Sequence, residues 1–341
     1  MIRKLFVRLT HWEYWPFSVL YFPVFLYYGW LVLKHRSFFF FTAANPSIKF
    51  GGMFGEKKSD IFRLIPGEYL PKTVLISKGD IERASFLAEQ IGFPLIAKPD
   101  IGERGTWVKK ISNHEEVKKY ANSCPVDFLL QEMATHPIEL GVFYVKKPGE
   151  KGRVTSIVKK EFLYVIGDGK QTIMELLKES DRALLTANLK SDFLKMNADK
   201  VPADGEQILI EPIGNHCRGT KFLDDNHEID DELHVAFNKL ADQIPDFYFG
   251  RFDLKCDSYE DLKQLKNFKI LELNGAGSEP GHIYQPGYSL WKAYRSIFWH
   301  LAVLSDISAQ NRKRRHSYWS FRQGFNMWKS HRRYNRLLAN S

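Results

Sequence analysis

The segment FGRFDLK, residues 249–255, and the segment FKILELN, residues 268–274, decide the fold of this 341-residue sequence. Each alternates apolar and polar side chains, which is the period of a β-strand with one buried face. The polar insert 257–267 separates the two segments and suits the connection of a hairpin. The pattern therefore predicts two neighbouring strands that run in opposite directions.

Three side chains with oxygen atoms would meet on such a pair of strands. Residues two apart on a strand point to the same face, so Asp253 lies with Arg251, and Glu272 lies with Asn274. Asp253, Glu272 and Asn274 would then offer the hard oxygen ligands that Mg²⁺ takes together with water and substrate phosphates. Two polar surface strands satisfied by solvent are the alternative, and spacing alone leaves both open. The stretch ELNGAGSEPG favours the metal site, because three glycines and a proline follow the carboxylates.

Working outward from these strands, segments with strand and helix patterns alternate along the chain without an internal repeat. The pattern indicates an α+β fold with antiparallel sheets rather than a regular βαβ array. Strands are expected at 38–44, 73–76, 93–98, 106–111, 128–133, 139–145 and 154–165, and helices at 56–65, 80–91, 115–121, 172–180 and 290–304.

A lysine and a glycine-containing turn form a second motif. Lys98 lies near the end of the strand segment IAKP, and the turn GERGT follows at 102–106. A lysine at a strand end can reach phosphate oxygens, and glycines let backbone N–H groups approach them closely. The order is neither that of a P-loop nor GxGxxG, and a glycine-rich hairpin turn is the alternative.

A third motif is the end of an apolar strand. Gln131, Glu132 and Met133 close this strand, and Glu139 follows seven residues after Glu132. Such a strand end can present acceptors to an adenine edge and to ribose hydroxyls. Charged residues at strand ends more often simply face water, so this motif is weak when taken alone.

In this order the three motifs resemble the ATP-grasp superfamily, and more closely its carboxylate–amine ligases of the D-alanine–D-alanine ligase and cyanophycin synthetase type. The resemblance covers roughly residues 71–283 and implies an α+β ATP-grasp fold, in which two α+β subdomains clasp ATP. It also implies ATP and Mg²⁺, or Mn²⁺, as cofactors. By this resemblance the cofactor-binding residues are Lys98, Gly102, Arg104, Gly105, Thr106, Gln131, Glu132, Met133, Glu139 and Lys159, and the metal ligands are Asp253, Glu272 and Asn274. Alternate strand residues face opposite sides, so only one of Lys159 and Lys160 can face the nucleotide.

The reaction that the resemblance implies is formation of an amide bond. ATP phosphorylates a substrate carboxylate, and an amine attacks the resulting acylphosphate. Arg251 and Arg218 are the expected catalytic residues, and the planar guanidinium of Arg218 suits the acylphosphate. An ordinary surface arginine is the alternative for Arg218. A non-catalytic, membrane-associated nucleotide-binding or scaffold protein on the same fold is the alternative function.

The sequence departs from the family at both ends of the resemblance. The family usually begins with a Rossmann-like domain, whereas the region before residue 71 is shorter here, with Lys58 as a further candidate phosphate contact. The usual ending of the last motif is replaced by NGAGS, so the substrate end of the site is not predicted. Four parts are expected: an aromatic-rich apolar segment at 1–36 that is a candidate for membrane association, a shortened pre-ATP-grasp region at 37–72, an ATP-grasp domain at 73–287, and C-terminal helices with a basic aromatic tail at 288–341.

Residues 14–33 form a run of 20 without a charge. This length can span the hydrocarbon region of a bilayer, which is about 30 Å thick. Nine of the 20 residues are aromatic, and Pro16 and Pro23 interrupt the run. Aromatic side chains concentrate at the membrane interface rather than at its centre. A buried helical hairpin, an interfacial segment and a true span therefore all remain hypotheses.

The formal charge of +9 belongs to the C-terminal tail. Residues 312–341 hold nine basic residues and no acidic one, while the first 311 residues hold 40 of each sign. Six aromatic residues are mixed with these cations, which suits an anionic membrane surface, where each basic residue contributes about 1 kcal/mol. Nucleic acid is the less favoured partner, and a helix packed by its aromatics on the body is the third reading. With residues 1–36, the tail predicts a protein at the inner face of the membrane.

The composition places the chain among globular proteins of a reducing compartment. Hydrophobic residues make up 44% of the sequence, which excludes global disorder. Cys124, Cys217 and Cys256 lie far apart, so they form neither a disulfide framework nor a CxxC metal site. With no evident secretory signal, a cytoplasmic location is expected. The expected substrates are a small-molecule or peptide carboxylate and an amine, whose identities the sequence does not specify.

Overall fold

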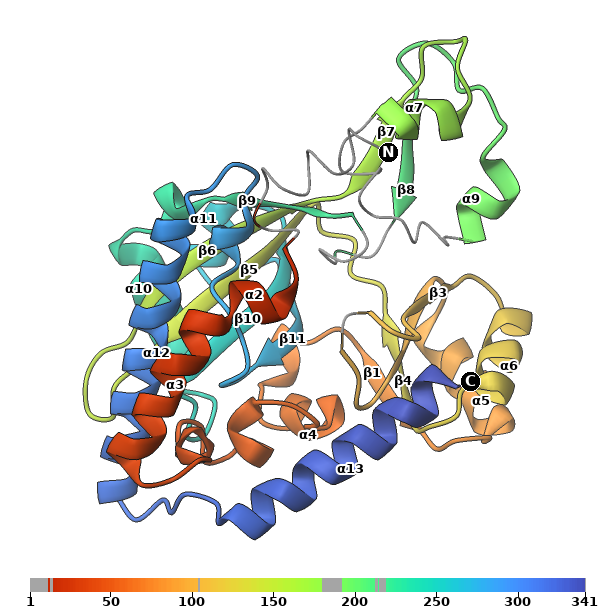
Figure 1. The fold of residues 1–341 in the computed structure, drawn as a ribbon. Helices are drawn as coiled ribbons and strands as arrows, with labels where there is room; N and C mark the ends of the chain where they lie inside the picture. The colour runs from red at the N-terminus through yellow and green to blue at the C-terminus, as the bar shows by residue number, and fades with distance from the viewer. Residues whose placement is uncertain are drawn as a thin grey trace.

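A computed structural model describes residues 12, 15–103, 105–179, 192–211, 214 and 219–340. Its strands form three antiparallel sheets with helices packed around them (Figure 1). Sheet A has the order β1-β4-β2-β3, sheet B has the order β11-β10-β5-β6-β9, and sheet C pairs β7 with β8. The expected α+β fold with antiparallel sheets is confirmed.

Sheet B contains the two segments that hold the predicted metal ligands. Its strands are β5 (Ile138–Val145), β6 (Arg153–Glu161), β9 (Lys221–Asp224), β10 (Phe249–Cys256) and β11 (Phe268–Asn274). β10 and β11 are antiparallel neighbours, with Asp253 opposite Glu272 and Arg251 opposite Asn274. The insert between them forms a short helix, α11 (Tyr259–Lys263), whose first turn is capped by Ser258. The predicted pairing of the two strands is therefore confirmed.

Helices cover both faces of sheet B. On one face, α10 (Asp231–Ala241) packs its buried Phe237 against Phe252 at 5.5 Å between ring centroids. On the other face, α12 (Leu290–Lys313) joins a core that includes Phe143 and Phe249. Because alternate strand residues share a face, this second face continues from Phe143 and Phe249 to Arg251 and Asp253. It is apolar at one end and polar at the other.

Sheet A forms a smaller unit with two helices. Its strands are β1 (Thr73–Ile76), β2 (Leu95–Pro99), β3 (Lys109–Ile111) and β4 (Phe128–Glu132), and its helices are α5 (Ile81–Ile91) and α6 (His114–Ser123). The Asp80 carboxylate accepts a hydrogen bond from the Arg83 N–H at 3.1 Å, so the predicted N-cap of α5 is confirmed. Strand β3 is shorter than expected, because residues 105–107 form a turn.

Sheet C projects from the rest of the molecule at the top of Figure 1. It consists of β7 (Leu163–Ile166) and β8 (Gln207–Glu211), with α7 (Ile173–Glu179) and α9 (Asp192–Asn197) beside them. The single long strand expected at 154–165 is in fact two strands. β6 ends at Glu161 within sheet B, and β7 begins at Leu163 and pairs in sheet C instead.

The strand expected at 38–44 was wrong. Residues Phe40–Ala43 form a 3₁₀ helix, in which the Thr42 hydroxyl donates to the Phe39 carbonyl at 2.7 Å. The consecutive aromatic rings at this position are almost all buried, so they need partners on several sides rather than on the two faces of a strand. The helix expected at 56–65 is the shorter α4 (Lys58–Phe62), preceded by a 3₁₀ turn at Lys49–Gly52 and followed by another at Gly67–Tyr69.

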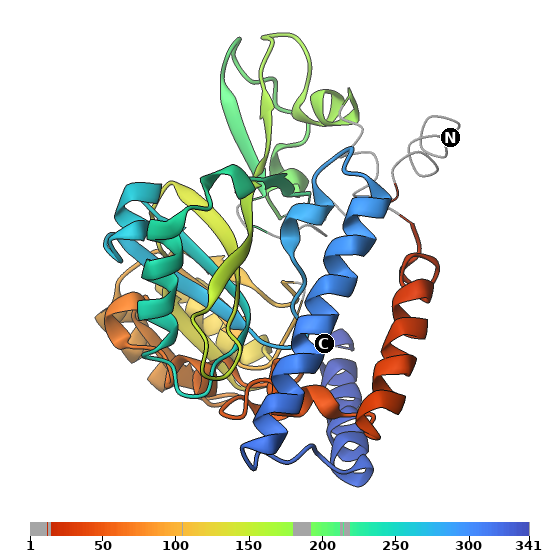
Figure 2. The same cartoon turned by 90° about the vertical axis from the view of Figure 1, so that its left-hand side faces the viewer.

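The aromatic run of residues 14–33 forms two consecutive helices, α2 (Phe17–Leu20) and α3 (Phe22–His35). Its prolines begin these helices rather than break one, since proline is tolerated in a first helical turn. One side of α3 buries Val24, Leu31 and His35, and α3 lies along α12 (Figure 2). None of the helices in the described part of the chain has both the length and the apolar character needed to cross a bilayer.

The basic tail is a folded helix, α13 (Phe321–Ala339), with a capping box formed by Ser320 and Gln323. Its first half packs by Met327 into the core that contains α12. Its end packs by Leu338 onto the core of sheet A, where the Trp107 indole donates to the Leu338 carbonyl at 3.0 Å. Helix α13 thus crosses from one part of the protein to the other (Figure 1).

Candidate active site

A cavity of about 480 Å³ lies between sheets A and B. Strands β2 and β4 and the loop 102–106 line it on one side, and β5, β6, β10 and β11 line it on the other. Within the described residues, every predicted site residue lines this cavity except Lys159. Motifs that are more than 100 residues apart in sequence therefore meet in one place.

Lys98 lies on β2 at the sheet A side of the cavity and is only 7% exposed. Its ammonium donates to the Gln131 side-chain oxygen at 2.8 Å and to the Leu271 carbonyl at 3.1 Å. It also lies over the ring of Phe62, 5.4 Å from the centroid. Burial lowers the pKa of Lys98 to about 8, and the Glu272 carboxylate opposes this shift only in part. An anionic ligand beside the Lys98 ammonium, in addition to the Glu272 carboxylate, would therefore be favoured.

The strand end at Gln131–Met133 lines the cavity as predicted, but two of its side chains are engaged within the protein. The Gln131 amide donates to the Thr73 hydroxyl at 2.9 Å. The Glu132 carboxylate accepts from the Lys72 backbone N–H at 3.1 Å. The side chains of this strand end therefore fix β1 against β4.

Described residues of the loop 102–106 line the same cavity as Lys98. Gly102, Gly105 and Thr106 line the cavity, and Gly105 adopts a φ of +72°, a conformation that favours glycine. The Gly102 carbonyl accepts from the Lys58 ammonium at 2.7 Å. Glu103 lies 3.2 Å from the imidazole of His331 on α13. The loop is thus tied both to the N-terminal region and to the C-terminal helix.

Lys58 and Glu272 form an ion pair at 3.3 Å across the cavity. Nearby, Glu56 also lines the cavity, and its Oε2 atom is buried without a hydrogen-bond partner in the structure. Burial raises the pKa of Glu56, and the charges of Glu272 and Glu103 raise it further. Sequence reasoning included Lys58 but missed Glu56, whose position depends on the fold of residues 45–57.

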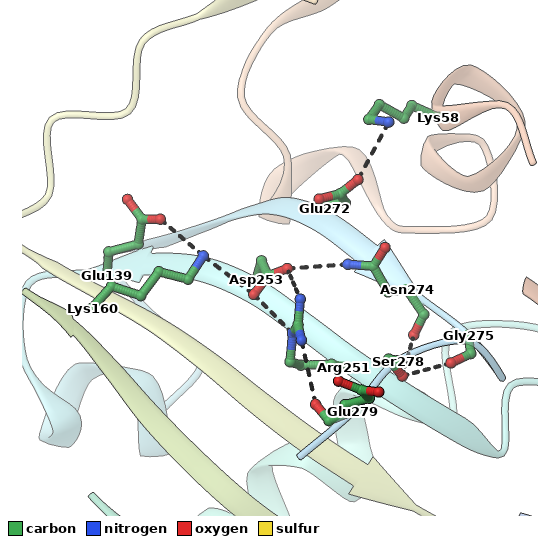
Figure 3. Close-up of polar contacts among 10 residues, drawn as sticks. All are labelled: Lys58, Glu139, Lys160, Arg251, Asp253, Glu272, Asn274, Gly275, Ser278 and Glu279. Atoms are coloured by element: carbon green, nitrogen blue, oxygen red, sulfur yellow. Dashed lines mark hydrogen bonds and ion pairs between the residues drawn. The ribbon is translucent and has the colours of Figure 1, made fainter. Parts of the chain in front are cut away.

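Asp253 is the centre of a polar cluster on sheet B (Figure 3). Arg251 donates to both of its carboxylate oxygens, at 3.1 and 2.9 Å, and the Asn274 amide donates to Oδ2 at 3.1 Å. Although burial opposes ionisation of Asp253, Arg251 and Lys160 hold its pKa below the usual value. Asp253 is therefore a firmly ionised carboxylate.

Lys160 rather than Lys159 faces the cavity. Its ammonium lies 3.0 Å from Glu139 Oε1 and 3.4 Å from Asp253 Oδ1. The prediction named Lys159, and the structure corrects it, because alternate residues of β6 point to opposite faces of the sheet. The Glu139 carboxylate, expected to hold a ribose, is 6% exposed and bonded to Lys160.

Gly141 on β5 makes room for this cluster. A Cβ atom at this position would lie 2.8 Å from Val158 Cγ1 and 3.2 Å from both Arg251 Cδ and Asp253 Oδ1. The side chains of Arg251 and Asp253 therefore pass directly over the backbone of Gly141. No sequence motif indicated this glycine, since its role appears only when β5 and β10 are paired.

The glycines that follow Glu272 and Asn274 have a packing role. A Cβ atom at Gly275 would lie 2.8 Å from Gly52 Cα, and one at Gly277 would lie 2.2 Å from the Met53 carbonyl. The backbone of this loop also bonds to the loop Gly51–Gly52 at 3.0 and 2.9 Å. These glycines attach β11 to the N-terminal region, so they are not in themselves a sign of a metal site.

Glu279 also lines the cavity, on the side of Arg251, and was not predicted. Its carboxylate accepts hydrogen bonds from the hydroxyls of Tyr21 and Tyr284, the latter at 2.5 Å. Its backbone carbonyl accepts from Arg251 at 3.3 Å. Tyr21 comes from the junction of α2 and α3, so the aromatic N-terminal segment reaches the edge of the site.

Two predicted residues, Arg104 and Arg218, lie outside the described residues, as do His216 and Cys217. Arg218 belongs to the loop expected to cover a transferred phosphate. Gly214, just before this loop, lines the cavity. A Cβ atom at Gly214 would lie 2.2 Å from Glu139 Oε1. Gly214 itself therefore lies close to the carboxylate of Glu139.

The donor atoms at Asp253, Glu272 and Asn274 suit Mg²⁺ in kind, because all three offer hard oxygens. The unpartnered Oε2 of Glu56 is a further oxygen that a cation beside Glu272 would satisfy. In the arrangement described, the Asp253 oxygens are occupied by Arg251, Lys160 and Asn274. Among the described residues, no three His, Cys, Asp or Glu side chains are grouped closely enough to hold a metal ion by themselves.

No protein family model matches the chain, and no curated protein is similar to it in sequence. Solved structures do resemble its fold. A bifunctional glutathione synthetase from Pasteurella multocida matches with 13% identity over 71% of this chain and 35% of that one, with a TM-score of 0.37. D-alanine–D-alanine ligase from Bacillus anthracis matches with 13% identity over 76% of this chain and 68% of that one, with a TM-score of 0.43.

A third solved structure is that of the ATP-grasp ligase PsnB in complex with a minimal precursor, Mg and ADP. It matches with 13% identity over 73% of this chain and 58% of that one, with a TM-score of 0.38. The chain thus spans between 35% and 68% of the length of these three proteins. At such low identity and TM-score, the likeness transfers no activity to this chain.

Proposed function

We propose that this chain is an ATP- and Mg²⁺-dependent ligase that joins a carboxylate to an amine through an acylphosphate intermediate. The observation that carries the proposal is the single cavity into which all three sequence motifs converge. It holds a buried, incompletely compensated lysine at one end and an arginine–aspartate cluster at the other. This combination suits a nucleotide whose phosphates lie between the two sheets.

The sheet A end of the cavity binds the nucleotide in this proposal. Lys98 and Lys58 contact phosphate oxygens, and the loop Gly102–Thr106 covers them, with Arg104 as a further contact. The segment Gln131–Met133 lies beside the adenine, and Glu139 lies near the ribose. Phosphate charge next to Lys98 would raise its pKa again and hold it protonated at neutral pH.

In this proposal the phosphoryl transfer takes place at the sheet B end of the cavity. The γ-phosphoryl group moves to an oxygen of the substrate carboxylate, and ADP leaves. The amine nitrogen then attacks the acyl carbon, the bond from carbon to the phosphate oxygen breaks, and inorganic phosphate and a proton are released with the amide. Arg251, which Asp253 fixes through two hydrogen bonds, stabilises the negative charge of the transferred group, and Arg218 does so from its loop.

Asp253, Glu272 and Asn274 would hold Mg²⁺, or Mn²⁺, which supplies positive charge beside the phosphates. Lys58 currently neutralises Glu272 at 3.3 Å. In the proposed complex the Lys58 ammonium would contact phosphate oxygens as well as Glu272. Removing the Glu272 charge should therefore affect catalysis far more than folding, because this side chain is about one third exposed.

The test is a screen for ADP release across amino acids, short peptides and cell-envelope precursors. With a carboxylate and an amine that give ADP release by the wild type, Glu272→Gln and Asp253→Asn should each abolish ADP formation. Glu260→Gln, an exposed carboxylate on α11, is the matched control and should leave the rate unchanged. Turnover that persists when both Asp253 and Glu272 are changed would refute the proposal.

One observation favours a second candidate, a membrane-associated nucleotide-binding or scaffold protein without catalysis. Asp253 is already bonded to Arg251, Lys160 and Asn274, which is a self-sufficient cluster. A protein of this kind would bind MgATP and show the same dependence on Lys98, yet would release no ADP with any carboxylate and amine. The screen described above separates the two functions.

The proposed ligase works at the inner face of the cytoplasmic membrane, through parts of residues 1–36 and 312–341. Helix α3 carries exposed apolar side chains, and α13 carries exposed basic ones, which supports this location. Nucleic acid remains the less favoured partner of the tail.

A further inference from the structure

Helix α3 presents an apolar stripe to the outside of the protein. Phe22, Phe25, Leu26, Trp30 and Leu33 are between 51% and 77% exposed. Their spacing of three and four residues puts them on one side of the helix. The opposite side is buried, as described above, so the stripe is not an incidental consequence of a loosely packed helix.

A series of aromatic contacts, which passes through the buried Phe39, connects Phe38 with a second group of exposed rings on α13. Phe38, which is 52% exposed, stands 5.1 Å from Phe39, and Phe39 stands 6.1 Å from Phe321 at the start of α13. Phe321, Phe325 and Trp328 then follow at 6.0 and 5.6 Å between centroids along the helix. All three are at least 40% exposed. Figure 2 places α3 and α13 on the same side of the molecule.

Basic residues surround these apolar side chains. The ammonium of Lys329 lies 5.0 Å from the Phe325 ring, and the guanidinium of Arg332 lies 5.3 Å from Trp328. Lys34 lies 5.6 Å from Trp30 on α3, and its ammonium is also 3.8 Å from the Asp306 carboxylate of α12. The segments 15–55 and 307–341, which supply this face, contain no acidic residue at all.

We infer that α3, Phe38 and the exposed side of α13 form a docking face for an anionic lipid bilayer. The apolar side chains would enter the interfacial region, and the cations beside them would contact headgroup phosphates. An exposed apolar surface rimmed by charges of one sign marks such a site. The inference builds on the proposed membrane location and names its surface and its lipid class.

The chemistry of this face disfavours the other occupants. A second copy of the chain would set like charges against each other across a twofold axis, which opposes association. A nucleic acid would find cations and stacking rings on α13. On α3, however, it would meet Leu26 and Leu33, which offer neither charge nor a flat ring.

The experiment is flotation of the full chain with vesicles of phosphatidylcholine alone and with about one third phosphatidylglycerol. It needs neither ATP nor substrate, so its outcome is independent of the proposed ligase reaction. Wild type should float with the anionic vesicles and much less with neutral ones. Leu26→Asn with Leu33→Asn should weaken binding at least about tenfold. Lys329→Glu with Arg333→Glu should do the same, and should abolish the preference for anionic lipid.

The matched control is Val235→Asn with Lys239→Glu on α10, an apolar and a basic residue that are both exposed and lie away from this face. It should bind vesicles as wild type does, and thermal unfolding should confirm that all variants are folded. Equal flotation of all variants, or no flotation of wild type with anionic vesicles, would overturn the inference. So would a dimer that the α3 variant dissociates, or salt-sensitive RNA binding in place of vesicle binding.

Discussion

Two nearly buried lysines at opposite sides of one cavity differ in their partners. Lys160 on sheet B lies between two carboxylates, at 3.0 Å from Glu139 and 3.4 Å from Asp253. Although burial opposes its charge, those carboxylates raise its pKa. Lys98 on sheet A is bonded only to neutral oxygens, and burial lowers its pKa to about 8. The charge of Lys160 is compensated by two carboxylates within the protein, whereas that of Lys98 is compensated only in part, by Glu272.

The largest expected effect is the loss of stability when Lys160, the lysine between two carboxylates, is replaced. Lys160→Met would leave Glu139 and Asp253 buried with one cation fewer, which should lower the free energy of unfolding by about 3–5 kcal/mol. Denaturation by urea measures this change. Lys159→Met, its neighbour on the other face of β6, is the control and should cost little. Equal stability of the two variants would contradict the comparison.

The lowered pKa of Lys98 should make the free energy of unfolding depend on pH. The pKa of Lys98 is 10.5 when unfolded and about 8 when folded, so the unfolded chain binds more protons between these values. Stability therefore rises with pH across this window, by up to about 3 kcal/mol, and is constant with respect to Lys98 below pH 8. The measurement is the difference in unfolding free energy between wild type and Lys98→Met from pH 7 to 10. A flat difference would show that Lys98 keeps an ordinary pKa.

Nucleotide binding should depend on Lys98 by a smaller amount. Lys98→Met removes a charge-assisted hydrogen bond to phosphate that is worth about 2 kcal/mol, so the Kd for MgATP at pH 7 should rise about 30-fold. Isothermal titration calorimetry measures this affinity. Lys118→Met on the exposed side of α6 is the control. An unchanged Kd would mean that the anion expected beside Lys98 is not the nucleotide.

The smallest expected effect concerns the link between α2–α3 and the site. Tyr21→Phe removes the hydrogen bonds of the Tyr21 hydroxyl to Glu279 and to the Tyr284 hydroxyl. It should cost only about 1 kcal/mol of stability, because Tyr284 still donates to Glu279. Tyr27→Phe is the control, because the structure shows only ring contacts for Tyr27. Chemical denaturation of both variants gives the comparison. A loss for Tyr27→Phe as large as that for Tyr21→Phe would show that the hydroxyl of Tyr21 is not the cause.

The predictable parts of the fold are those in which a local sequence pattern is compatible with only one local structure. The alternation in 249–255 and 268–274 predicted neighbouring strands, and Asp80 predicted the start of α5, because capping is a local interaction. The segment 38–44 was misjudged, since four consecutive aromatic residues look like a buried strand but pack on several neighbours. The break between β6 and β7 was also missed, because no proline or glycine marks it.

For the candidate site, sequence order indicated Lys98, Asp253, Glu272 and Asn274, which all line the cavity. It could not choose between Lys159 and Lys160, because the face of a strand depends on its register. It also missed Glu279 and Tyr21, which are more than 250 residues apart and meet only through the packing of α2 and α3 on the body of the protein.

The sequence by itself determined the residue types of the site, the antiparallel α+β architecture and the separation of charge between body and tail, because these follow from local period and composition. Only the tertiary structure decided which lysine has its charge compensated by carboxylates and which glycines allow the close approach of other side chains or backbone segments. It also decided which sides of α3 and α13 remain exposed. The reason is that burial and partner choice depend on distant segments coming together. The sequence of a run such as 14–33 is compatible with a buried helix, with an interfacial segment and with a membrane span, so the sequence alone does not distinguish them.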